Sequence, residues 1–174
     1  MRVLRRTSWC SNVLRPSWDL TWMSVAEKLA ERSRCESRGV GAVIVTDDNR
    51  PVAVGYNGPP RGLDFPIYST CGSWCSRRQN NDQTTSYDNC VTVHAEINAL
   101  MFADRRDYDG GTLYVTSSIC WDCGKAVANS GIARIVCMID WDRDGHRNPQ
   151  RTIDFLYDCG IDVDIFYEQG APNA

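Results

Sequence analysis

Two short segments of the chain carry the side chains best suited to bind a metal ion. One is His94-Ala95-Glu96, and the other is Cys-Trp-Asp-Cys, which runs from Cys120 to Cys123. One imidazole and two thiolates suit zinc, and three protein ligands leave the fourth position free for water, as in catalytic zinc sites. His94, Cys120 and Cys123 are therefore predicted to hold a catalytic zinc ion.

Glu96 stands two residues after the predicted ligand His94, close to the metal without having to bind it. Zinc lowers the pKa of a bound water toward about 7, and a carboxylate beside that water can carry its proton to a substrate. A His-x-Glu segment combined with Cys-x-x-Cys is typical of zinc deaminases that act on cytosine or adenine. Glu96 is therefore predicted to be the proton shuttle of a hydrolytic deamination.

Each segment taken alone has a simpler interpretation. A Cys-x-x-Cys pair also occurs in structural zinc sites and in redox centres, and a single histidine at a helix start can be a cap or a core residue. A non-catalytic zinc protein is one alternative for the whole chain. Glu96 argues against it, because a purely structural site has no need of a carboxylate at that place.

Hydrophobic periodicity predicts that helices and strands alternate around these segments. Ser17 is a good N-cap before an apolar face with helical spacing, and short β-branched runs such as VGAVIVT predict buried strands. Helices are expected at 17–34, 95–103, 121–129 and 151–158, and strands at 40–46, 51–56, 112–116, 134–139 and 163–167. This order predicts an α/β fold, in which helices cover a partly parallel sheet.

These residues and their surroundings resemble the deoxycytidylate (dCMP) deaminase family, within the cytidine deaminase superfold. The likeness runs from about Arg15 to Tyr167 and is carried by RPSWDLTWMSVAEKLAERSRCESRGVGAVIV, GYNGPPRG, CVTVHAEINAL and GIDVDIFY. It implies a three-layer α-β-α fold with a five-stranded mixed sheet, and zinc-dependent hydrolysis of dCMP to dUMP, which supplies dTMP synthesis. Ile119 departs from the family, which usually has proline before the first cysteine, so the loop beside the base is expected to differ.

The resemblance also implies which residues bind the nucleotide. Asn57 would contact the sugar and orient the base, and the loop of Gly58 and Arg61 would lie near the phosphate, because glycine lets backbone N–H groups approach an anion. A plain turn at Asn57-Gly58 and a solvated Arg61 stay open as alternatives. The full set of predicted substrate-binding residues is Asn57, Gly58, Arg61, Val93, Ala95, Ser117 and Ser118.

Cys35, Cys71, Cys75 and Cys90 form a second group of thiols. Members of the family that this chain resembles often carry a further, structural zinc, and four thiolates would make a closed tetrahedral site. Such a site would also explain how the long insert at 57–91 can be ordered. The alternative is that some of these cysteines are ordinary small apolar residues.

Composition limits the classes of protein to which the chain can belong. Its 174 residues with 43% hydrophobic content fit one domain at 16–174, and no apolar run is long enough to span a membrane. A net charge of −3 disfavours a nucleic-acid partner. Nine cysteines at uneven spacing favour a reducing, cytoplasmic setting. Residues 1–15 are rich in arginine and are expected to be a disordered extension, with a transit peptide as the alternative.

The preferred substrate and the assembly stay open at this stage. Deamination of dCTP, cytidine or a 5-modified dCMP is an alternative to dCMP, and a polynucleotide deaminase is a more distant one, because such enzymes need a basic groove and stacking aromatics. The resemblance further implies a homo-hexamer that dCTP activates and dTTP inhibits.

Overall fold

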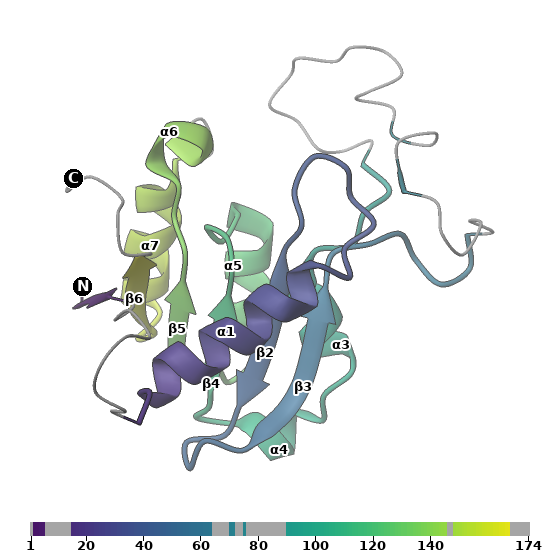
Figure 1. Cartoon of the computed structure of the whole chain (residues 1–174). Coiled ribbons are helices and arrows are strands. Elements are labelled where there is room, and N and C mark those ends of the chain that lie inside the picture. Colours follow the sequence, from purple (N-terminus) through teal and green to yellow (C-terminus); the bar gives the residue numbers. More distant parts are fainter. Residues whose placement is uncertain are drawn as a thin grey trace.

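A mixed β-sheet forms the middle of the computed structural model, which describes residues 2–5, 15–63, 70–71, 75, 90–145 and 148–167 (Figure 1). In this part of the chain the strands are β1 (Arg2–Arg5), β2 (Gly41–Val45), β3 (Pro51–Tyr56), β4 (Thr112–Val115), β5 (Arg134–Cys137) and β6 (Asp162–Tyr167). They lie in the order β1-β6-β5-β4-β2-β3. The strands β4, β5, β6 and β1 are parallel, and β2 is antiparallel to both β3 and β4.

The helices are α1 (Trp18–Ala30), α3 (Ala95–Met101), α4 (Arg105–Tyr108), α5 (Trp121–Ala128), α6 (Trp141–Asp144) and α7 (Pro149–Asp158). The helices α1, α3, α5 and α7 and the strands β2 to β6 follow one another in the predicted order, which confirms that prediction. Ser17 caps α1 as predicted, because its side chain accepts a hydrogen bond from the Leu20 N–H at 3.2 Å. The helix ends at Ala30, earlier than predicted, and α4 and α6 are short helices that periodicity could not show.

The strand β1 differs from the expected unstructured extension. The backbone of Arg2–Arg5 pairs in parallel with β6, with Arg2 opposite Asp164 and Arg5 opposite Tyr167. An edge strand presents unpaired N–H and C=O groups, and a neighbouring segment can satisfy them whatever its composition. Four residues carry too little periodicity to be recognised in the sequence. The rest of the predicted extension, residues 6–14, and most of the insert at 57–91 lie outside the described residues.

The sheet is the middle of three layers, as predicted. Helix α1 crosses one face, and α3, α5 and α7 lie on the opposite face (Figure 1). On the α1 face, Met23 and Ala26 are buried against strand residues that include Val43, Tyr114 and Phe166. The larger cluster on the other face joins α3, α5 and α7 to the sheet. None of the described helices combines the length and the apolar character that a membrane crossing requires.

Gly55 lets α3 approach the sheet closely. A Cβ atom at this position would lie 2.2 Å from the Ala95 carbonyl oxygen, a distance that no side chain tolerates. The first turn of α3 therefore packs directly on the backbone of β3. This contact fixes the distance between the sheet and the residues at the start of α3.

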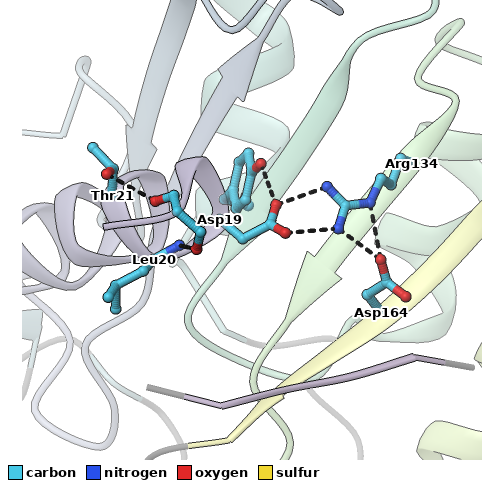
Figure 2. Close-up of polar contacts among 7 residues, drawn as sticks. Asp19, Leu20, Thr21, Arg134 and Asp164 are labelled. Atoms are coloured by element: carbon cyan, nitrogen blue, oxygen red, sulfur yellow. Dashed lines mark hydrogen bonds and ion pairs between the residues drawn. The ribbon is translucent and has the colours of Figure 1, made fainter. Parts of the chain in front are cut away.

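The α1 face also holds a partly buried group of charged side chains, which Figure 2 shows. Arg134 of β5 lies between Asp19 of α1 and Asp164 of β6, with nitrogen–oxygen distances of 2.7 Å to each carboxylate. The Tyr114 hydroxyl donates to Asp19 at 2.7 Å. Bidentate contacts of this kind have a defined geometry, so the group fixes α1 against the two strands.

Candidate zinc and nucleotide site

The predicted metal ligands meet where two helices begin beside the end of β4. His94 is the N-cap of α3 and Cys120 is the N-cap of α5. The ligand atoms of His94, Cys120 and Cys123 all lie within 4.8 Å of one another. The His94 Nδ1 atom is 3.3 Å from the Cys123 sulfur and 3.4 Å from the Cys120 sulfur. The structure therefore brings together the three residues that the sequence predicts as ligands.

This donor set fits zinc. Two thiolates and one imidazole around a common centre are a known catalytic arrangement, and a tetrahedral ion held by three protein groups keeps one position open. Side-chain hydrogen bonds from Cys123 and His94 lower the pKa of the Cys120 thiol to about 4, against the opposing effect of burial. One thiolate is thus already favoured, which is the form that binds a cation.

Glu96 lies in the first turn of α3 and is only 3% exposed. Burial raises the pKa of its carboxyl above the ordinary value, although the nearby His94 opposes this. A buried carboxyl beside the three candidate ligands is placed where a proton must be moved between a metal-bound water and a substrate. The position of Glu96 therefore matches that of a proton shuttle.

A cavity opens beside the four residues, with an empty volume of about 710 Å³ including its open mouth, which lies in the usual range for small-molecule sites. Its lining includes Cys35, Ser37, Arg38, Val40, Asn57, Cys90, Thr92, His94, Ala95, Glu96, Ser117, Ser118, Cys120, Arg143 and Asp144. One hydroxyl group of this wall, Thr92 Oγ1, is buried with no hydrogen-bond partner among the described residues, and the Ser118 hydroxyl faces the Asp144 carboxylate. An unpartnered buried hydroxyl is costly, and a polar ligand would satisfy it.

Asn57 is 6% exposed and lies at the cavity wall directly after β3. Its Oδ1 atom accepts a hydrogen bond from the Val40 N–H at 2.8 Å, and its Nδ2 group donates to the Arg38 carbonyl oxygen at 2.8 Å. The amide therefore holds the segment before β2 in place. One Nδ2 hydrogen and one Oδ1 lone pair remain for a ligand.

Two arginines of the cavity were missed by the sequence interpretation. Arg38 forms an ion pair with Asp144, a carboxylate that is 1% exposed. Arg143 donates to the Ser37 carbonyl oxygen at 2.5 Å. Burial would raise the pKa of Asp144, but its hydrogen bond and ion pair with Arg38 outweigh burial and hold the pKa below the ordinary value.

Assigning these two arginines to the cavity requires knowledge of the strand order. Arg38 precedes β2 and Arg143 follows β5, and β2 is antiparallel to β4, which is parallel to β5. The start of β2 and the end of β5 therefore lie at the same edge of the sheet. Without that topology, two arginines 105 positions apart show no relation, although both stand just outside a predicted strand.

Other predicted substrate residues occupy several positions. Gly58 and Val93 form an isolated β-bridge, with N–O distances of 3.1 and 2.8 Å, which joins the end of β3 to the segment before His94. Ala95 and the pair Ser117 and Ser118 line the cavity. Arg61 is exposed and is not among the residues that line it.

The second group of cysteines is divided between the cavity and the insert. Cys35 and Cys90 line the cavity, whereas Cys71 and Cys75 are buried. The Cys71 N–H donates to the Arg34 carbonyl oxygen at 2.8 Å. Burial raises the pKa of the Cys71 thiol, and the nearby Cys35 and Cys75 add to this. Among the described residues, His94, Cys120 and Cys123 are the one group of three or more candidate ligands whose atoms lie this close together.

Comparison with known proteins agrees with this geometry. The model of the cytidine and deoxycytidylate deaminase zinc-binding region matches residues 16–139. The deoxycytidylate deaminase of Mycobacterium phage D29 is 43% identical over 128 residues, which cover 70% of this chain and 94% of that protein. The crystal structure of the dCMP deaminase from cyanophage S-TIM5 in apo form matches with a TM-score of 0.62 at 26% identity, over 87% of this chain and 99% of that one. The structure of the same protein with dCMP and dUMP gives a TM-score of 0.61 at 26% identity, over 87% and 98%.

Proposed function

The chain belongs to the cytidine and deoxycytidylate deaminase family, and on that premise we propose that it hydrolyses dCMP to dUMP and ammonia. The observation that carries this proposal is the buried Glu96 beside the His94, Cys120 and Cys123 cluster. A structural zinc site has no use for a buried carboxyl in that position. A proton-transfer site requires one.

The residues of the site divide the reaction between them. His94, Cys120 and Cys123 would hold the zinc ion, which supplies a water of lowered pKa as the nucleophile. Glu96 would move one proton of that water to N3 of cytosine and then the remaining hydroxyl proton to the 4-amino group, which leaves as ammonia as the C4–N4 bond breaks and the C4 carbonyl forms. Ala95 and the residues at 117–118 form the wall against the base, and the Thr92 hydroxyl offers a partner for a polar group of the substrate.

Arg38 and Arg143 support a nucleotide over a nucleoside. Both guanidinium groups belong to the cavity lining, and arginine binds phosphate with two parallel hydrogen bonds. Asp144 neutralises only one of the two positive charges. The remaining charge favours an anionic substrate, and we place the 5′-phosphate beside Arg143 rather than beside the exposed Arg61.

Ammonia release from zinc-loaded protein tests the substrate. The panel contains dCMP, dCTP, deoxycytidine, cytidine, CMP, 5-methyl-dCMP and a single-stranded oligonucleotide, and dCMP is expected to give the highest kcat/KM. Preference for dCTP or 5-methyl-dCMP would replace dCMP within the same family. Turnover of the oligonucleotide alone, with zinc bound, would reject the free-nucleotide assignment.

Two matched arginine variants locate the phosphate. Arg143→Gln is expected to lower kcat/KM for dCMP about tenfold or more, as loss of one charge-assisted hydrogen bond does, and to leave deoxycytidine unaffected. Arg61→Gln serves as the control and is expected to change neither substrate. The reverse pattern would move the phosphate to the loop of Gly58 and Arg61, as the sequence alone predicted.

We also propose a second, structural zinc held by Cys35, Cys71, Cys75 and Cys90. Its support is the influence of Cys35 and Cys75 on the Cys71 thiol, together with the backbone hydrogen bond that joins Cys71 to Arg34, in the segment between α1 and β2. Metal analysis of the folded protein is expected to give two zinc ions per chain. A single ion that disappears in Cys120→Ser would reject the second site.

The remaining expectations concern assembly, regulation and location. We propose a homo-hexamer responsive to dCTP and dTTP, and Met101 and Phe102 support an interface because they are 71% and 73% exposed at the end of α3. Light scattering of wild type and Phe102→Ser, with and without each effector, checks the assembly. We also propose a cytoplasmic location, which suits the eight free cysteines of the described chain and which imaging of tagged protein checks.

A further inference from the structure

Trp121 stands between the two cysteine ligands, as the first residue of α5. The residue before them, Ile119, is 6% exposed and occupies the place where the resemblance to the family predicts proline. Proline would fix φ of the approach to Cys120, and isoleucine leaves that dihedral free. The metal-binding turn therefore needs a restraint from elsewhere in the chain.

Helix α7 supplies contacts to Trp121 on two sides. The Trp121 and Phe155 ring centroids are 5.0 Å apart with an interplanar angle of 47°. The Arg151 guanidinium carbon lies 4.2 Å from the centroid of the Trp121 ring, within the range of a cation–π contact. Arg151 and Phe155 are four residues apart, so they project from the same face of α7. We call these three residues the tryptophan clamp.

The clamp stands on a well-anchored helix. Asn148 caps α7 by accepting a hydrogen bond from the Arg151 N–H at 3.3 Å. Deeper in the interface, a Cβ atom on Gly124 of α5 would lie 2.9 Å from the Thr152 methyl carbon, so the two helices are in close contact there. This close packing limits the movement of the start of α5 relative to α7.

We propose that the tryptophan clamp positions the metal-binding turn, so that α7 acts on the zinc site without touching the metal. The turn is short: the Cys123 N–H donates to the Cys120 sulfur at 3.5 Å, and the Gly124 N–H donates to the Cys120 carbonyl oxygen at 2.8 Å. Fixing the side chain of Trp121 fixes the backbone between the two sulfurs. The clamp thus replaces, by packing, the restraint that proline would give through its ring. This inference rests on the metal site and not on the identity of the nucleotide.

The test measures zinc release from the folded protein to an excess of a chromogenic chelator. Trp121→Ala is expected to release the ion about tenfold faster than wild type, the size of effect seen when a group that orients a metal ligand is removed. Trp121→Phe keeps a ring against Phe155 and is expected to restore most of the slow release. Gln150→Ala is the matched control: Gln150 is an exposed neighbour that lines the same surface pocket as Trp121, and its amide donates to the Asp154 carboxylate at 2.7 Å.

A cobalt-substituted protein gives a second reading that general destabilisation does not produce. The visible absorption of Co²⁺ bound to thiolates reports the coordination geometry directly, and its intensity is expected to fall in Trp121→Ala and to be kept in Trp121→Phe. Arg151→Met removes the cation from the helix surface without opening the core, so it keeps the test available where Trp121→Ala does not fold. The proposal would be overturned if Trp121→Ala and Arg151→Met both released zinc at the wild-type rate with an unchanged cobalt spectrum. Where Trp121→Ala does not fold, the same result in Arg151→Met alone would overturn it. Because no nucleotide is used, this failure is separate from a failure of the dCMP assignment.

Discussion

On the α1 face of the sheet, Arg134 lies between Asp19 and Asp164, whereas at the edge where β4 ends, Arg38 lies against Asp144 and opens onto a cavity. Both places bury ionised groups. They differ in how completely those groups are satisfied. In the first place Arg134 and the Tyr114 hydroxyl donate to the two carboxylates, while the second also contains the Thr92 hydroxyl, which has no partner among the described residues, and the buried carboxyl of Glu96.

This difference separates structural charge from functional charge in the same molecule. An ion pair that is partly removed from water needs further hydrogen bonds to stabilise a fold, and the group around Arg134 has several of them. A site that must bind a ligand keeps donors and acceptors free, at a cost in stability, until the ligand arrives. Changes at the two places should therefore alter different measured quantities.

The largest expected effect is on turnover. Glu96→Gln removes the proton shuttle and is expected to lower kcat about a thousandfold, within the range for general acid–base catalysis. Zinc content and the thermal midpoint should stay near those of wild type, and Glu31→Gln, at an exposed ion pair with Lys28, is the control. A kcat that stays within tenfold of wild type would show that another group carries the proton.

The next effect is on stability and should leave catalysis alone. Arg134→Met strands two carboxylates, so we expect the free energy of unfolding to fall by about 2–3 kcal/mol, less than for a completely buried pair because 28% of Arg134 is exposed. Urea unfolding of the zinc-loaded protein measures this. The exposed pair of Arg106 and Asp104 provides the control, since Arg106→Met should cause no measurable change. A loss of kcat in Arg134→Met without a loss of stability would contradict the distinction between structural and functional charges.

A smaller effect distinguishes binding from packing at the cavity. Asp144→Asn removes the carboxylate that neutralises Arg38 and so adds positive charge to the cavity, and we expect kcat/KM for dCMP to rise by up to about tenfold, which corresponds to one charge-assisted contact with the phosphate. Deoxycytidine, which has no phosphate, should react as it does with the wild-type protein. Steady-state kinetics with both substrates give the ratio. An equal loss for both substrates would mean that Asp144 only supports the fold.

The smallest effect concerns one hydrogen bond on the α1 face. Tyr114→Phe removes the hydroxyl that donates to Asp19 and keeps the ring in the core, so the free energy of unfolding should fall by about 1 kcal/mol. Turnover of dCMP should not change. The comparison is sharpened by a double variant with Arg134→Met, where the two changes share Asp19 and should not add. Strict additivity would show that the hydroxyl and the guanidinium act independently.

The sequence alone identified the elements and the residues that carry the chemistry. The spacing of His94 and Glu96, the Cys-x-x-Cys pair and the helical and strand periodicities are local patterns. Such patterns can be recognised in the sequence because each involves only a few neighbouring residues, and the metal ligands lie in two short motifs at the starts of helices. The three metal ligands and the sheet covered by helices were predicted for this reason, and the three-layer arrangement followed from the resemblance to the family.

Relations between distant segments were decided only by the tertiary structure. The pairing of Arg38 with Asp144 joins residues 106 positions apart, and that of Arg134 with Asp19 joins residues 115 positions apart. Neither pairing leaves a periodic or motif signal. The edge strand Arg2–Arg5 and the contact of Trp121 with α7 are of the same kind, because strand order and helix packing determine them. The sequence thus determined which groups perform the chemistry, and the packing of the sheet and helices determined which groups hold them in place.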